Sequence, residues 1–230
     1  MRTLNTIEKY LLLAQHPEKG RWMISDMILP YGIVGAILLG MNLRGLLKID
    51  GKYLLVNDQA GEINQLKQPL DYEVFNLIKN SKKKRKITQW ISKVSRKVKT
   101  FKWVILYRME KDGYFSIEHK KFLFIPYKIC RLKEKSERNE LIQRLREIVL
   151  KGQNSSPDEA VLLSLIYSSG GQGILSNDRK EKREIKKALK LFIKENPIAE
   201  SVDQTIQEVQ VAISAAVTAA TVSATVTTSS

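Results

Sequence analysis

The sequence contains one cysteine, Cys130, and only two histidines, His16 and His119. A single cysteine excludes a disulfide within the chain, and so few cysteines and histidines exclude the clusters that bind structural zinc. These absences fit a protein of the reducing cytoplasm that folds on a hydrophobic core alone. With 230 residues, 43% of them hydrophobic, the chain is long enough for one sizeable core.

Long hydrophobic runs are equally scarce. The segment closest to a membrane span, residues 27–43, holds seventeen residues without a charge. A membrane-spanning helix needs about 20 apolar residues, and this segment also contains Pro30, Asn42 and three glycines. We therefore expect a helix that begins after Pro30 and is apolar on all sides because it lies in the middle of the molecule. The first twenty residues likewise have too short an apolar run for an export signal.

Acidic residues are absent from residues 82–102, and this absence leaves a concentrated positive charge. The formal net charge of the chain is +15, and two thirds of it comes from this stretch. Charge so concentrated attracts polyanions, either the phosphates of nucleic acid or the headgroups of an acidic lipid leaflet. The ten cations are Lys82, Lys83, Lys84, Arg85, Lys86, Lys93, Arg96, Lys97, Lys99 and Lys102.

Catalytic motifs are missing as well. The glycine-rich residues 169–173 lack the lysine and the hydroxyl residue of a nucleotide-binding loop. The carboxylates are dispersed, and no nucleophile, histidine and acid fall at a recognisable spacing. We therefore expect a protein that is not an enzyme and that needs neither a cofactor nor a metal.

The sequence does contain helical periodicity. Apolar residues recur every three or four positions over residues 5–15, 71–79, 87–110 and 179–194, around Leu141 and Leu145, and from Val202 onward. Ser156, Pro157 and Glu159 form a start signal for another helix, which we expect to run through Tyr167.

Two segments have the pattern of β-hairpins instead. Residues 46–58 read as two short strands around Asp50-Gly51, and residues 114–129 read as a second hairpin that turns near His119-Lys120. The predicted fold is therefore mainly α: a single helical domain over residues 1–200, built around the apolar central helix and carrying two short β-hairpins. Residues 201–230 are predicted to form a terminal core helix that frays into an Ala/Val/Thr/Ser tail.

The order of these pieces resembles that of the Golgi phosphoprotein 3 family of phosphatidylinositol 4-phosphate effectors. The resemblance is carried by EKYLLLAQHPEKGRW, GMNLRGLLKID, MEKDGYFSIEHKKFLF, ELIQRLREIVLKG and DEAVLLSLIYSSG, and by the Ala/Val-rich terminal helix. It implies a peripheral membrane adaptor in the cytoplasm that binds anionic phospholipid headgroups and links the membrane to the cytoplasmic tails of membrane proteins.

The resemblance also implies a headgroup site. Family members bind the headgroup through a tryptophan and an arginine in the N-terminal part and two basic residues three apart on a later helix. Alignment on Gly113 places Lys99 and Lys102 at the paired basic positions, whereas Val34 occupies the arginine position. Trp22 lies a few residues upstream of the family tryptophan, and Arg21 beside it is our substitute for the missing arginine.

The family hairpin acts in self-association and membrane contact. Its counterparts here are Phe122, Leu123, Phe124 and Ile125, flanked by Lys120, Lys121 and Lys128. Strand alternation predicts that two of these four apolar residues point away from the core, toward a partner chain or acyl tails. The alternative is that both faces are covered within the molecule.

Two other functions remain open from the residues alone. A basic helix followed by a hairpin also describes a winged-helix nucleic-acid binder, although the apolar residues of the hairpin do not suit phosphate contact. A scaffold that self-associates through the hairpin is the third possibility.

Overall fold

The computed structural model describes residues 2–51, 53–57, 69–195, 211 and 214–215, and the side chains of residues 69, 97–100 and 194–195 lie outside that description. The chain is mainly helical with two small antiparallel sheets, as predicted. Its helices are α1 (Thr6–Ala14), α2 (Leu29–Leu43), α3 (Pro69–Lys79), α4 (Ile87–Lys111), α5 (Ser136–Lys151), α6 (Pro157–Ser168), the short 3-10 helix η2 (Gly171–Ile174) and α7 (Arg179–Glu195), and its strands are β1 (Leu47–Asp50), β2 (Tyr53–Val56), β3 (Arg85–Lys86), β4 (Phe115–Phe122) and β5 (Ile125–Leu132).

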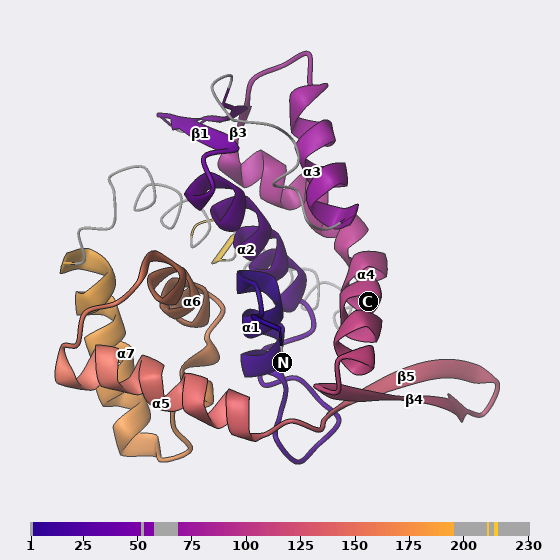
Figure 1. Cartoon of the computed structure of the whole chain (residues 1–230), viewed down its shortest axis with the longest axis vertical. Helices are drawn as coiled ribbons and strands as arrows, with labels where there is room; N and C mark the ends of the chain where they lie inside the picture. Colours follow the sequence, from indigo (N-terminus) through magenta and orange to yellow (C-terminus); the bar gives the residue numbers. More distant parts are fainter. Residues whose placement is uncertain (1, 52, 58–68, 196–210, 212–213, 216–230) are drawn as a thin grey trace, which may run out of the picture.

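Helix α2 is the centre of the molecule, and the prediction of an apolar core helix is confirmed. Its side chains are buried on every side, including Ile33, Val34, Leu38 and Met41. Figure 1 shows α1 beside α2, with α5, α6 and α7 on one side of this pair and α3 and α4 on the other. Among the described residues, no helix combines the length and hydrophobicity that a membrane crossing requires.

The two central helices approach closely at Gly32. A Cβ atom at this position would lie 2.0 Å from the hydroxyl oxygen of Tyr10, which is fully buried in α1. Only glycine therefore allows the Tyr10 ring to lie directly on α2. The contact fixes α1 against α2 and, with it, the loop that follows α1.

A buried arginine joins α5 to the end of α1. Arg138 is 3% exposed, and its guanidinium donates hydrogen bonds to the carbonyl oxygens of Leu12 (3.2 Å) and Leu13 (3.1 Å). These carbonyls belong to the last turn of α1, where a helix has no partners of its own. Burial lowers the pKa of Arg138, but an arginine remains charged at neutral pH.

The first hairpin forms as predicted, and a third strand joins it. Strands β1 and β2 pair with Asp50 opposite Tyr53, and Gly51 in the turn has φ of 56°. Strand β3 then pairs with β2, with Arg85 opposite Leu54. Part of the lysine run is therefore an edge strand, which the sequence analysis did not predict.

The second hairpin forms, but the predicted position of its turn is wrong. His119 pairs with Lys128 in mid-strand, and the turn lies at Leu123 and Phe124, between the paired residues Phe122 and Ile125. The segment contains no Asn-Gly or Asp-Gly dipeptide to mark a two-residue turn. Leu123 itself takes the left-handed conformation, with φ of 56°.

The remaining helices agree with their predictions to within a few residues. Ser156 caps α6 and exchanges hydrogen bonds with Glu159 as the start signal indicated. The predicted terminal helix from Val202, and with it the prediction for residues 201–230, falls almost wholly outside the described residues.

We predict that Arg138→Met lowers the free energy of unfolding by about 2–3 kcal/mol, because two buried carbonyls lose a charged donor. Urea denaturation measures this loss. The matched control is Arg183→Met on the exposed surface of α7, which is expected to change stability by less than about 0.5 kcal/mol. Equal stabilities of the two variants would contradict the assigned role of Arg138.

Candidate functional site

The loop after α1 is held against strand β5 by Gln15. This side chain is fully buried, and its amide nitrogen donates to the carbonyl oxygens of Cys130 (2.9 Å), Arg21 (3.1 Å) and Lys19 (3.2 Å). The loop also approaches β5 at Gly20, where a Cβ atom would lie 2.1 Å from Cγ2 of Ile129. Together these contacts place the next residues of the loop beside α4.

Trp22 and Lys102, two of the residues that the family resemblance places in a headgroup site, lie close together. The ammonium nitrogen of Lys102 lies 5.3 Å from the centroid of the Trp22 ring and 5.5 Å from that of Trp103. Lys128 of β5 lies 5.1 Å from the Trp103 ring and 4.9 Å from the Tyr107 ring. These distances are typical of cation–π contacts. We call this row of alternating rings and cations the cation–aromatic ladder, made of Trp22, Lys102, Trp103, Lys128 and Tyr107.

The ladder ends at His119. The Tyr107 hydroxyl and His119 Nε2 are 3.1 Å apart, and the two rings are stacked at 6.3 Å. Because His119 and Lys128 are register partners in the hairpin, α4 contacts both strands through Tyr107. The ladder therefore joins the loop after α1, helix α4 and the hairpin.

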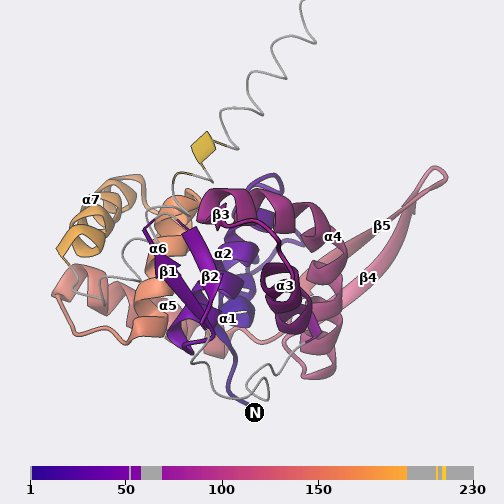
Figure 2. The ribbon, with the colours of Figure 1, turned by 90° about the horizontal axis from the view of Figure 1, so that it is seen from above.

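Beyond the ladder, the hairpin projects from the body of the protein (Figures 1 and 2). At its tip Phe122, Leu123, Phe124 and Ile125 are exposed by 68%, 78%, 96% and 68%. The prediction was that two of these four point away from the core, with coverage of both faces as the alternative; instead all four are exposed, because the tip extends past the helices that would cover one face. Lys120, Lys121 and Lys128 are exposed beside them.

The ten cations of residues 82–102 do not form one surface. Nine residues separate Lys93 from Lys102, so their side chains lie about half a turn apart around α4 and about 13 Å apart along it. Lys93 and Arg85 instead stack on Trp90, at 5.5 Å and 5.6 Å from its ring centroid. The exposed members at this end of α4 are Lys82, Lys83, Lys84, Lys86, Lys93 and Arg96.

The other predicted site residues differ in where the structure places them. Arg21 is exposed in the loop next to Trp22. Lys97 and Lys99 belong to α4, but their side chains lie outside the described part of the chain. Val34 is fully buried in α2, so this position faces the core and supplies no cation to the ladder.

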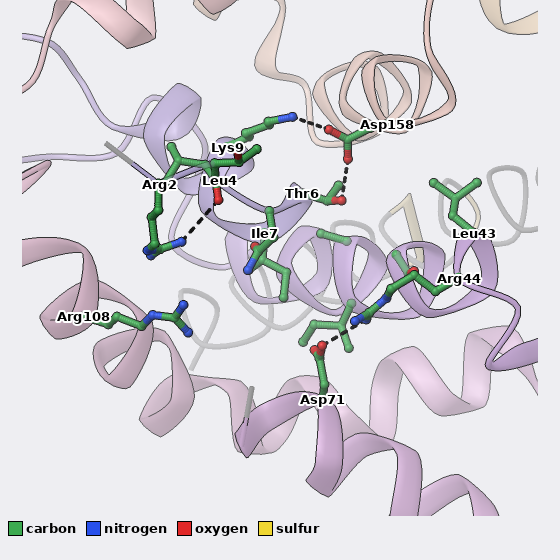
Figure 3. Close-up of a pocket in the computed structure, with 15 residues that line it drawn as sticks. Arg2, Leu4, Thr6, Ile7, Lys9, Leu43, Arg44, Asp71, Arg108 and Asp158 are labelled. Carbon is green, nitrogen blue, oxygen red and sulfur yellow. Dashed lines mark hydrogen bonds and ion pairs between the residues drawn. The ribbon is translucent and has the colours of Figure 1, made fainter. Parts of the chain in front are cut away.

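Figure 3 shows a cavity between the start of the chain, α2, α3 and α4. Its volume is about 950 Å³. Leu4, Ile37 and Leu43 contribute apolar walls. Its four cations all face carboxylates: Arg2 contacts Glu8 and Asp112 at 2.7 Å, Lys9 contacts Asp158 at 2.5 Å, Arg44 contacts Asp71 at 2.9 Å, and Arg108 lies 3.9 Å from Glu8. Since the charges balance, this cavity is a poor site for an anion.

Burial raises the pKa of two titratable groups near these sites. Burial raises the pKa of the Cys130 thiol to about 12, which makes it unreactive at neutral pH. Burial also raises the pKa of Asp71, while Arg44 acts in the opposite direction. Among the described residues, no three histidine, cysteine or acidic side chains are arranged to hold a metal ion.

The central part of the ladder, formed by Trp103, Lys128 and Tyr107, was not predicted from the sequence. Trp103 and Tyr107 are four residues apart on α4, a spacing that places two side chains on the same helical face. That spacing could have revealed the pair. The position of Lys128 above both rings depends on the hairpin register, which the misplaced turn obscured.

In a comparison with protein families, the model of the Golgi phosphoprotein 3 (GPP34) family matches residues 7–209. No curated protein sequence matches the chain significantly. The matched range contains α1 except its first residue, α2 through α7, the ladder and the hairpin.

We predict that Cys130 reacts slowly with a thiol reagent such as DTNB at pH 8, and that Gln15→Ala speeds the reaction. Loss of the Gln15 hydrogen bonds should let the loop lift from β5 and raise the labelling rate about fivefold or more. Gln143→Ala, at an exposed position on α5, is the matched control and should leave the rate unchanged. A native Cys130 that reacts as fast as a free thiol would contradict the described burial.

A second prediction concerns Asp71. Its raised pKa means that the folded state holds this proton more tightly than the unfolded state does. Stability contributed by the protonated form is therefore present below the unfolded pKa and is lost as pH rises toward the folded pKa. Asparagine does not ionise, so Asp71→Asn should remove this loss. As pH rises from 4 to 7, the free energy of unfolding of the variant should therefore increase relative to that of the native chain. Urea denaturation of both proteins at the two pH values tests this, and parallel pH profiles would refute it.

Proposed function

Because the chain belongs to the Golgi phosphoprotein 3 family, we propose that it is a peripheral membrane adaptor of the cytoplasm that binds anionic phospholipid, with phosphatidylinositol 4-phosphate as the family's expected headgroup. One observation carries the proposal: the ladder holds Lys102 and Lys128 at the base of a projecting hairpin whose tip exposes four apolar side chains. Such a combination suits a surface that is anionic outside and apolar beneath.

The magnitudes support reversible membrane binding. Burying one large apolar side chain contributes about 1.5–3 kcal/mol, so two or three inserted residues of the tip supply a useful part of the affinity. Each lysine near an anionic leaflet adds about 1 kcal/mol. Lys121 and Lys120 lie beside the tip, Lys120 also paired with Glu118 at 3.0 Å, so their ammonium groups meet headgroups when the tip reaches the acyl chains. Lys128 lies farther from the tip, against the rings of α4.

The ladder orients the hairpin for this contact. Stacked rings on α4 hold Lys128 and His119, one residue from each strand. A hairpin fixed in this way loses less conformational freedom on binding than a mobile one. We propose that Trp22 and Lys102 form the headgroup end of the site, with Lys99 and Arg21 as further contributors.

We propose limited headgroup selectivity. A lysine presents a point charge, whereas an arginine offers a planar fork that matches a phosphate. The family's arginine position holds the buried Val34. The headgroup therefore meets lysines in place of a bidentate donor, and other anionic lipids should compete with phosphatidylinositol 4-phosphate.

The remaining family properties stay proposals of the same kind. The hairpin would serve self-association through the same apolar tip, and the body would bind the tails of membrane proteins. The competing nucleic-acid function is disfavoured by the tip itself, since four exposed apolar residues replace the polar groups that phosphate contact requires.

We predict that the chain floats with vesicles containing phosphatidylinositol 4-phosphate and only weakly with neutral vesicles. Replacing Phe122, Leu123 and Phe124 by serine should weaken vesicle binding at least about tenfold, because the apolar contact is lost. Lys102→Ala combined with Lys128→Ala should reduce binding to anionic vesicles and leave the weak neutral binding unchanged.

The matched control for the tip is Leu150→Ser with Leu191→Ser, which changes two exposed leucines on α5 and α7 and should leave flotation unaffected. A gel-shift titration with duplex DNA is run in parallel. Tight, salt-sensitive DNA binding without flotation would overturn the adaptor proposal in favour of the nucleic-acid function.

A further inference from the structure

At the other end of α4 from the ladder, the lysine ridge (residues 81–86) lies between two open depressions. One depression, of about 620 Å³, lies on the side of β1 and β2, and the other, of about 580 Å³, lies on the side of α3 and α4. Ser81 and Lys83 line both. We propose that the ridge is a second anion site, separate from the membrane site, whose ligand carries several phosphate groups.

Among the described residues that line this site, cations outnumber carboxylates. With Lys48 left aside, six described cations line the two depressions against two described carboxylates, Asp50 and Glu73, which leaves a net charge of +4. The one ion pair described between these residues, Lys84 with Asp50, is exposed and spans 3.7 Å. The larger cavity of Figure 3 differs sharply, because each of its cations faces a carboxylate. The six cations are Lys79, Lys82, Lys83, Lys84, Arg85 and Lys93.

The backbone of the ridge is fixed. Arg85 and Lys86 form strand β3 against β2, and the Ser81 hydroxyl donates a 2.8 Å hydrogen bond to the carbonyl oxygen of Lys83. Stacking on Trp90 holds the Arg85 guanidinium. The lysines are therefore presented from an ordered support, which lowers the entropic cost of binding a ligand.

Two buried donors at this site have no acceptor. Trp90 lines the first depression and is 1% exposed, and its indole Nε1 has no hydrogen-bond partner among the described residues. Arg85 lines the second depression, and its buried Nε is unpartnered in the same sense. An unpaired buried donor is costly, and phosphate oxygens are strong acceptors for such groups. Both sides of the ridge thus favour the same ligand chemistry.

The geometry favours several phosphates over one. Lys83 borders both depressions, whereas Lys79 and Lys84 border only the first and Lys82 and Lys93 only the second. A ligand that places phosphates on both sides of Lys83 would contact both sets. Such a ligand is either a soluble polyphosphorylated molecule or a multiply phosphorylated lipid headgroup.

Isothermal titration of the full chain with inositol hexakisphosphate tests the site. We expect saturable binding with one ligand per chain, weakened at least about tenfold in Lys82→Gln/Lys83→Gln/Lys84→Gln. The matched control, Lys186→Gln/Lys187→Gln/Lys190→Gln, removes the same charge from exposed positions on α7 and should bind like the native chain. Thermal melts of both variants confirm that they are folded.

Vesicles containing phosphatidylinositol 4,5-bisphosphate distinguish the two sources of the ligand. If the ligand is a lipid, the ridge variant binds these vesicles more weakly than the α7 variant does; if it is soluble, both variants bind the vesicles alike. Equal loss of inositol hexakisphosphate binding in the ridge and α7 variants would overturn the proposal, as would its abolition by Lys102→Ala/Lys128→Ala. Ridge-dependent binding of duplex DNA at lower concentrations than inositol hexakisphosphate would also overturn it. The inositol hexakisphosphate titrations contain no membrane and do not depend on the hairpin, so the ridge proposal and the proposed function can each fail alone.

Discussion

The burial of α2 on all sides is the constraint on which the rest of the structure depends. A helix without a polar face must be covered from every direction, and here α1, α4, α6 and the first hairpin provide the cover. Helix α4 is far longer than the part of α2 that it covers. The rest of its surface is therefore free to form other contacts. One end of α4 presents aromatic rings that contact the projecting hairpin, and the other end presents a cluster of positive charge.

The two kinds of charge in this protein follow from where carboxylates are available. Around the cavity of Figure 3, the carboxylates of Glu8 and Asp71 are buried. Each forms an ion pair with an arginine, Glu8 with Arg2 and Asp71 with Arg44, so these two arginines are occupied by contacts within the fold. Residues 82–102 contain no acid, and within the part of the chain that the structure describes, Asp50 and Glu73 are the carboxylates that line the ridge depressions. Net charge alone does not separate these cases, because a paired arginine and an exposed lysine count equally. Only the three-dimensional arrangement of the partners shows which cations can meet a ligand.

Much of the fold was predictable from the sequence, because its signals are local. The charge-free run of α2, the Ser156-Pro157-Glu159 start signal and the Asp50-Gly51 turn each specify their own element without help from distant residues. The second turn lacked such a signal, and its position at Leu123 and Phe124 follows from strand register instead. The candidate site depends on similar long-range facts. Gln15 brings Trp22 to Lys102 through contacts with β5, and β3 converts part of a charged run into a strand by pairing with residues thirty positions earlier. Neither contact leaves a periodic or spacing pattern in the chain.

The left-handed backbone of Leu123 has a consequence for any effort to engineer this protein. A residue other than glycine in this conformation costs about 1–2 kcal/mol, so glycine at the tip would relax the turn. Algorithms that optimise folding stability would favour that exchange, and they would delete one of the most exposed apolar side chains of the molecule. At this turn, a substitution that raises the folding stability removes apolar surface from the tip. A more stable variant can therefore have a weaker apolar contact with its ligand or partner.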